Sequence, residues 1–205
     1  MWWREFEPLA GRDGLVDGEH PLRQDPTASV SPAALLDCTK GPISIGARTR
    51  ICPGACIEGP VTIGADCLIG NLAMVRGTTI IGDGSRVGFA TEVKNAIIED
   101  HVTIGPQCFI ADSKIERGAY LGAQVRTSNH RLDKRTVEVM IDGRRVDTGL
   151  EKLGCLIGAR ASLGIQVIIL PGREIAPDSI FAPRSTVERN LPTGRYRPAQ
   201  RLELF

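Results

Sequence analysis

The segment QVRTSNHRLDKRT, residues 124–136, gathers side chains that can transfer protons and bind anions. Asn129 stands directly before His130, with Asp133 three residues on and Arg126 upstream. An imidazole titrates near neutral pH, so it can take a proton from an attacking group. An arginine can bind a phosphate or carboxylate through two parallel hydrogen bonds. His130 is therefore a candidate general base and Arg126 a candidate substrate-binding residue.

This segment interrupts a very regular pattern. From Ile45 to Val93 an aliphatic, β-branched residue stands at every sixth position, nine times without a miss. The period shortens by one residue before Ile98 and again before Ile115, and it resumes at Ile157 after the interruption. A period of six fits neither an α-helix nor a simple alternating strand, so it predicts a repeat architecture.

Each hexad has a second regular position. Four residues after most of the aliphatic positions stands a small or β-branched residue, such as Cys67. Each hexad therefore predicts a short strand with one large inward residue, followed by a corner with one small inward residue. Glycine often follows the aliphatic residue and supplies the backbone freedom of a tight corner. Three hexads would close a three-sided coil, and stacked coils would pair in parallel about 4.8 Å apart.

The run ISIGARTRICPGACIEGPVTIGADCLIG resembles the hexapeptide repeat of left-handed parallel β-helix proteins. The resemblance covers residues 28–190 and implies an all-β, left-handed parallel β-helix of about seven coils. The expected parts are an N-terminal cap or tail at 1–27, β-helix coils at 28–126, a protruding loop at 127–154, closing coils at 155–190 and a C-terminal tail at 191–205.

The loop and the two ends carry signals of their own. In VEVMIDGRRVDT two β-rich arms flank Asp142-Gly143, which predicts a hairpin. A solenoid exposes its ends and needs caps. Trp2, Trp3 and Phe6 are candidates for the first end, and RYRPAQRLELF is a candidate for the last.

Hexapeptide β-helices are mostly acyltransferases that use acetyl-CoA or another acyl thioester and form trimers with active sites between subunits. VGFATEVKNAIIEDHVTIG (87–105) resembles the acyltransferase half of sugar-1-phosphate nucleotidyltransferases, with Lys94 in the place of a substrate-binding lysine. VEVMIDGRRVDTGLEKLGCLIG resembles archaeal-type members, with Lys152 in the lysine position. Where those enzymes carry a catalytic histidine the chain has Pro106, which cannot act as a base.

SNHRLD resembles the Asn-His motif of maltose, galactoside and xenobiotic acetyltransferases, in which the histidine is the general base beside an excursion. This resemblance makes Asn129 and His130 the expected catalytic residues, with His101 as the rival base. Acetyl-CoA is then expected to lie along the later coils. The residues expected to contact it are Gly164, Ala182 and Arg184.

The expected function is an acyl-CoA-dependent acyltransferase, with acetyl-CoA in the first place, acting on an amino sugar, sugar phosphate or nucleotide sugar as a homotrimer. The alternative is a non-catalytic β-helix subunit that binds a sugar nucleotide or a partner protein. Pro106 and the lack of a nucleotidyltransferase domain favour that alternative. A thiol-release assay with acetyl-CoA separates the two.

The composition argues against nucleic-acid binding, membrane association and a metal site. The 25 Lys and Arg residues nearly balance the 24 Asp and Glu residues, so the net charge of +1 predicts no nucleic-acid or anionic-membrane partner. The sequence has no apolar run of about 18 residues and no signal-peptide layout, so a soluble cytoplasmic protein is expected. Six cysteines form no CxxC pair, and we expect buried thiols rather than a metal site.

Overall fold

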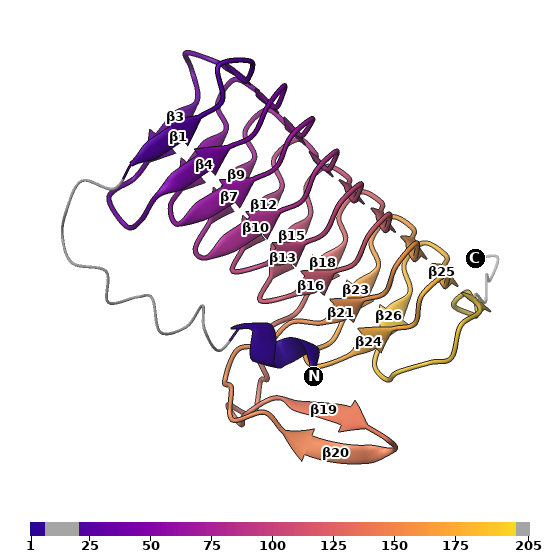
Figure 1. Cartoon of the computed structure of the whole chain (residues 1–205). Coiled ribbons are helices and arrows are strands. Elements are labelled where there is room, and N and C mark those ends of the chain that lie inside the picture. Colours follow the sequence, from indigo (N-terminus) through magenta and orange to yellow (C-terminus); the bar gives the residue numbers. More distant parts are fainter. Residues whose placement is uncertain (7–20, 200–205) are drawn as a thin grey trace, which may run out of the picture.

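The computed structural model describes residues 1–6 and 21–199 of the chain. The chain coils into a three-sided prism whose faces are three parallel sheets (Figure 1). The expected all-β, left-handed parallel β-helix is thus confirmed. Each face has eight or nine strands, so the prism has eight coils instead of about seven. The first coil begins at Leu22, ahead of the expected start at residue 28.

We call the faces A, B and C in the order in which the chain meets them. Sheet A contains β1 (Leu22–Gln24), β4 (Ile43–Ile45), β7 (Val61–Ile63), β10 (Thr79–Ile81), β13 (Ile97–Ile98), β16 (Lys114–Ile115), β21 (Leu156–Ile157) and β24 (Glu174–Ile175). Sheet B contains β2 (Ser29–Val30), β5 (Arg50–Ile51), β8 (Leu68–Ile69), β11 (Arg86–Val87), β14 (Thr103–Ile104), β17 (Tyr120–Leu121), β22 (Ser162–Leu163), β25 (Ile180–Phe181) and β27 (Arg195–Tyr196). Sheet C contains β3 (Leu35–Asp37), β6 (Cys56–Glu58), β9 (Met74–Arg76), β12 (Glu92–Lys94), β15 (Phe109–Ala111), β18 (Arg126–Thr127), β23 (Ile168–Ile169) and β26 (Thr186–Val187).

The aliphatic residues of the repeat stack in columns inside the prism. Ile63 pairs with Ile81 in sheet A, and Ile81 pairs with Ile98 on the next coil. All three side chains are almost completely buried. Burying a side chain of this size contributes roughly 1.5–3 kcal/mol. The repeated burial of one large residue per strand is therefore the main source of stability.

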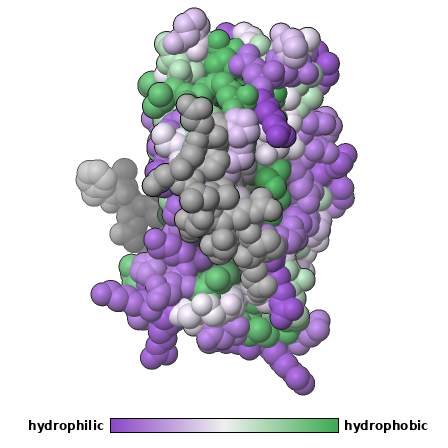
Figure 2. All heavy atoms as spheres, turned by 60° about the vertical axis from the view of Figure 1, so that its left-hand side comes forward, coloured by the Kyte–Doolittle hydropathy of each residue, from purple (hydrophilic) through white to green (hydrophobic). Residues whose placement is uncertain are grey.

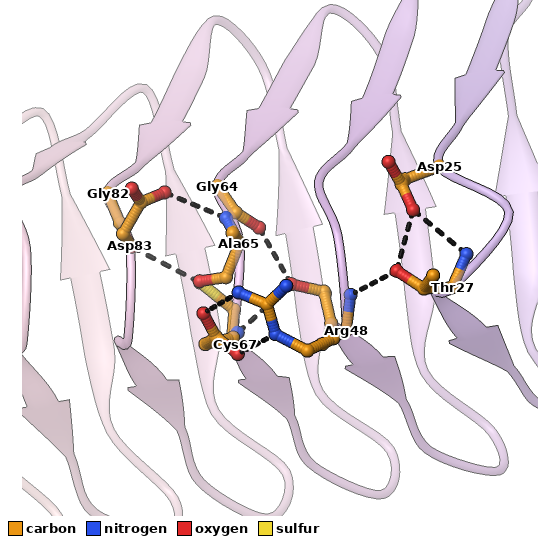
Figure 3. Close-up of polar contacts among 10 residues, drawn as sticks. Asp25, Thr27, Arg48, Gly64, Ala65, Cys67, Gly82 and Asp83 are labelled. Atoms are coloured by element: carbon orange, nitrogen blue, oxygen red, sulfur yellow. Dashed lines mark hydrogen bonds and ion pairs between the residues drawn. The ribbon is translucent and has the colours of Figure 1, made fainter.

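The small inward residues fill the corners, and several of their hydroxyl groups, including those of Ser85 and Thr91, donate to carbonyls of the next coil. Between sheets A and B, the Thr49 hydroxyl donates to the carbonyl oxygen of Gly64 at 2.7 Å and accepts from the backbone amide of Cys67 on the next coil at 3.0 Å (Gly64 and Cys67 are labelled in Figure 3). On the outside of the same corner, Arg48 forms an exposed ion pair with Asp66. Buried hydroxyls with partners cost little, so Thr and Ser are tolerated in the core.

The interruption of the repeat leaves the prism intact. Ile115 pairs directly with Ile157 in sheet A, although 41 residues separate them in sequence. The chain leaves sheet C after β18, forms the hairpin of β19 (Glu138–Ile141) and β20 (Arg144–Asp147), and returns to β21 (Figure 1). Asp142 and Gly143 at the turn both have positive φ, at 47° and 75°. The Asp-Gly signal thus correctly predicted the hairpin.

Trp2 and Trp3 do not cap the first coil, and the expectation was wrong for these two residues. The 3₁₀-helix η1 (Trp2–Phe6) lies beside the hairpin (Figure 1). The buried Trp2 and Trp3 rings pack with Val137, Val139 and Leu153 of the excursion. The Trp2 indole also donates to the carboxylate of Glu174 in β24, at 2.9 Å. The outward residues Ile97 and Leu156 of sheet A also pack against this second core, which is why the segment docks on a side face. The other partly buried members belong to the excursion and are Ile141, Val146 and Leu150. The side chain of Phe6 lies outside the described part.

The two ends of the prism differ. At the last coil, β27 pairs with β25 and Tyr196 stacks on Phe181 with ring centroids 4.9 Å apart, so the segment starting RYRPA does cap this end. At the first coil Leu22 and Leu35 are exposed. Apolar residues gather at this end, at the top of Figure 2.

The stacked core predicts that a carboxylate has very different effects on stability at the inward and the outward positions of strand β7. Ile63→Asp should unfold the protein, because an unpaired buried carboxylate costs more than about 4 kcal/mol. Thr62→Asp, one residue away on the outer face, should cost at most about 1 kcal/mol. Circular dichroism melts of the two variants provide the comparison. A folded Ile63→Asp protein that melts like Thr62→Asp would contradict an inward position for Ile63.

Candidate functional site

The excursion leaves the prism at the corner between sheets C and A, where a column of polar side chains stands. Asp112 is buried and accepts two amide hydrogen bonds, from Asn95 Nδ2 at 3.1 Å and from Asn129 Nδ2 at 2.5 Å. Asn95 and Asp112 have φ of 44° and 48°, a conformation that Asn and Asp tolerate best after glycine. The two hexads that are one residue short cross this same corner.

The root of the excursion is closed by backbone pairing. His130 and Lys152 form an isolated antiparallel bridge. Behind it the amide of Leu153 donates to the carbonyl of Asn129 at 2.9 Å, and the amide of Gly154 donates to the carbonyl of Asp112 at 2.8 Å. His130 and Lys152 are exposed. The predicted base and one predicted cation therefore stand opposite each other at the root of the loop.

The His130 ring makes one directional contact. Its Nδ1 atom lies 3.4 Å from the carbonyl oxygen of Glu151. A carbonyl oxygen can only accept a hydrogen bond, so this contact favours the tautomer with its proton on Nδ1. Nε2 then carries the free lone pair, which is the arrangement that a general base needs.

His130 borders a cavity of about 520 Å³ between the start of the loop and the end of sheet C. Arg131 and Asp133 form one wall and bind each other through two hydrogen bonds, at 2.8 and 2.5 Å. The bond from Arg131 holds the pKa of Asp133 well below its usual range. The residues lining the cavity are Ser128, His130, Arg131, Leu132, Asp133, Leu170, Pro171, Arg173 and Glu188.

Arg173 is a lining residue to which the sequence analysis assigned no role. Its Nε donates to the carbonyl of Pro171 at 3.1 Å, and its Nη2 donates to the carbonyl of Glu138 in β19 at 3.3 Å. Partial burial lowers the pKa of Arg173, and the nearby Arg145 and Arg131 lower it further. The sequence gives no signal for this position, because only the return of the hairpin brings Glu138 onto the turn after β23.

None of the three predicted substrate-binding cations lines the cavity, and only Lys152 stands opposite His130. Lys94 in β12 pairs with Ala111 on the next coil of sheet C. The pairing of Phe109 with Arg126 sets the register of the coil after that, in which Ala111 faces Ser128 at the edge of the cavity. Two strand spacings separate Lys94 from Ser128, which is about 10 Å. Arg126 lies toward the other edge of sheet C, where it donates to the carbonyl of Gln107. Within one chain, neither Lys94 nor Arg126 contacts His130.

The residues predicted to contact acetyl-CoA stand on another edge, the corner between sheets B and C. Gly164 and Ala182 occupy this corner on successive coils, where their amides donate to Phe181 and Tyr196 carbonyls, both at 2.8 Å. A Cβ atom on Gly164 would lie 2.7 Å from the nitrogen of Pro183, so coil stacking itself requires glycine here. The exposed Arg184 donates to Gln166 through Nε, which leaves the outer guanidinium nitrogens available to a phosphate.

The other candidates are also separated from His130. His101 has φ of 58° and lies at the corner between sheets A and B, beside Gly84. Pro106 is exposed at the corner between sheets B and C, and its carbonyl accepts from the amide of Gln124. His20 lies outside the described residues.

The cysteines behave as core residues. All six are free thiols, and four of them are buried. Burial raises the pKa of the Cys155 thiol to about 12. Across residues 1–6 and 21–199 no three His, Cys, Asp or Glu side chains gather as metal ligands. The same residues include no helix long and apolar enough to cross a membrane.

Known proteins resemble the chain at several levels. The family described as the GMPPB C-terminal domain matches residues 39–146. A protein of Escherichia coli strain K12 that is named as the uncharacterized acetyltransferase YaiX is 57% identical over 204 residues, which cover 98% of this chain and 88% of that protein. A bifunctional sugar-1-phosphate nucleotidylyltransferase/acetyltransferase of Sulfurisphaera tokodaii is 34% identical over 55% of this chain and 28% of that protein. The solved UDP-N-acetylglucosamine acyltransferase of Campylobacter jejuni has a TM-score of 0.43 and 16% identity, and the match covers 82% of this chain and 72% of that chain.

The polar column predicts that Asp112 fixes the root of the loop. Asp112→Gly keeps the positive φ but leaves the amides of Asn95 and Asn129 without their acceptor, so it should cost about 1–3 kcal/mol of unfolding free energy. Asp66→Gly is the matched control, because Asp66 has φ of 56° and forms only an exposed ion pair, worth at most about 1 kcal/mol. Urea unfolding measures both changes. Equal losses in the two variants would contradict an anchoring role for Asp112.

Proposed function

Because the chain belongs to the GMPPB C-terminal domain family and to the hexapeptide-repeat acyltransferases, we propose that it transfers an acetyl group from acetyl-CoA to an amino sugar, a sugar phosphate or a nucleotide sugar, with His130 as general base. The Sulfurisphaera relative, named for both sugar-1-phosphate and acetyl chemistry, supports the acceptor class.

One observation carries the assignment of His130. Its side chain is exposed at the root of the excursion and borders the cavity, and its Nδ1 faces a carbonyl oxygen. Nε2 is then free to accept a proton from an amine as the nitrogen forms its bond to the acyl carbon. As the carbon–sulfur bond breaks, the imidazolium returns that proton to the leaving thiolate.

The neighbours of His130 have supporting roles in this proposal. Asn129 fixes the backbone before the base, because Asp112 holds its amide. Lys152, opposite His130, is the best situated of the three predicted cations to attract the acceptor, and Lys94 and Arg126 reach it only if the acceptor extends along sheet C. The acyl donor is expected along Gly164, Ala182 and Arg184.

The proposed site requires more than one chain. His130 stands at the corner between sheets C and A, whereas the expected acyl-donor residues stand at the corner between sheets B and C. A threefold trimer brings one such corner of each subunit against the other corner of its neighbour. Exposed apolar residues along the corner between sheets B and C support association. They include Leu72, Phe89 and Ile165.

Loss of the proposed base should abolish most of the activity without changing the fold. His130→Ala should fold normally, because the residue is exposed, and should bind CoA as the wild type does. Its turnover with acetyl-CoA should fall by about 10²–10⁴-fold. Thiol release from acetyl-CoA, measured against a panel of amino sugars and their nucleotide derivatives, provides the assay.

His101→Ala is the control and should leave turnover unchanged, since His101 lies on another corner. Full activity of His130→Ala would exclude it as the base. Absence of thiol release by the wild type with every acceptor would instead favour the non-catalytic subunit.

The protein should be a trimer in solution. Light scattering at micromolar concentration should give three times the chain mass of 22.1 kDa. Phe89→Asp should weaken the trimer, because it introduces a charge into the apolar row, whereas Leu35→Asp at the exposed first coil should not. A wild-type protein that scatters as a monomer would refute the shared site.

A further inference from the structure

Arg173 stands out among the cations of the described chain. Its side chain is half-buried and lines the cavity beside His130. Its guanidinium donates only to the carbonyls of Pro171 and Glu138. None of the ion pairs formed by residues 1–6 and 21–199 includes it. A half-buried charge without a carboxylate partner is costly, so a local structure that retains one needs a reason.

The acidic groups near the cavity do not neutralise Arg173. Asp133 is engaged by both nitrogens of the Arg131 fork. Glu138 offsets the charge only in part, and its side chain lies 3.7 Å from Arg145 on the hairpin. Glu188 lines the cavity as an exposed residue of the last coil, and the ion pairs of the described residues include no pair between Glu188 and Arg173. Arg131 is paired with Asp133 and Arg145 with Glu138, which leaves Arg173 as the cation of this wall without a carboxylate partner of its own and therefore as the group that can attract an anion.

The position of Arg173 is also fixed in advance of any ligand. Gly172, directly before it, has φ of 71°, and its amide donates to Gly154 at 2.6 Å. A Cβ atom at Gly172 would lie only 2.3 Å from the carbonyl oxygen of Glu138. The turn and the hairpin therefore pack tightly, and the two carbonyl contacts hold the guanidinium plane. A held guanidinium loses less freedom when it binds a planar or tetrahedral anion.

We propose that Arg173 is the anion-binding residue of this cavity and that the acceptor carries a phosphate or carboxylate group, which Arg173 holds while the reacting amine faces His130. This inference rests on the proposed acyl transfer and narrows its acceptor to an anionic molecule. Leu132, Leu170 and Pro171 give the cavity an apolar wall, which suits a compact ring beside the anion. The rival source of the anion is a phosphate of CoA.

Binding can be measured without turnover. Isothermal titration of the wild-type protein with inorganic pyrophosphate at low salt should show binding. Arg173→Gln should weaken it by about 10- to 100-fold, the usual range for losing a charge-assisted hydrogen bond. Arg117→Gln is the matched control, because it removes the same charge from an exposed pair with Asp100 far from the cavity, and it should bind like the wild type. Arg173→Lys, which keeps the charge but not the fork, should lie between.

Titration with CoA separates the two sources of the anion. CoA affinity should be the same in the wild type and in Arg173→Gln, and a matching loss would assign Arg173 to the acyl donor and overturn the proposal. Equal pyrophosphate binding by the wild type and Arg173→Gln, or none by either, would overturn it as well. If Arg173→Gln does not fold, Arg173→Lys decides by the same comparison. In turnover with an acceptor, Arg173→Gln should raise KM and leave kcat nearly unchanged. Failure of the acyl-transfer proposal would appear instead as missing thiol release with pyrophosphate binding intact.

Discussion

The structure depends on one constraint, which is that each coil stacks its inward side chains directly over those of the coil before. The register holds from Ile45 through Ile63, Ile81, Ile98 and Ile115 to Ile157. Residues one coil apart in the chain thus become neighbours about 4.8 Å apart. Each corner consequently carries a column of like positions. Arginine–aspartate pairs occupy the corner between sheets A and B, and glutamines bond in series along the corner between sheets B and C.

The third column, between sheets C and A, has become the root of the candidate site. Asp112 serves both the departure and the return of the excursion, because its carboxylate accepts from Asn129 and its carbonyl accepts from Gly154. One buried residue thereby links the loop to the rigid prism. A base at the root of the loop is held in place by the rigid prism, and the cavity beside it lies between loop residues such as Arg131 and residues of the last coils such as Arg173. Precise sites need this kind of support from rigid elements.

The excursion is in turn held by the beginning of the chain. Trp2 and Trp3 cover the apolar side of the loop and hairpin, and the carbonyl of Glu138 in the hairpin receives Arg173. A segment at the N-terminus therefore supports a wall of the cavity that lies more than 120 residues further along the sequence. This connection explains why two tryptophans precede a repeat that has few aromatic residues.

The sequence alone determined the prism, the inward isoleucines, the small corner residues and the Asp-Gly hairpin, because each of these depends on local period and local backbone preference. It also identified the break at His130, since the repeat stops there. It missed one coil, because the pattern of the first coil is looser, and it assigned Trp2 and Trp3 to the wrong place. Only the tertiary structure decided where the excursion packs, that Lys94 and Arg126 stand apart from His130, and that Arg173 joins it. The physical reason is that a loop of this length can fold back over any face of the prism, and its position depends on apolar and carbonyl partners that are distant in sequence.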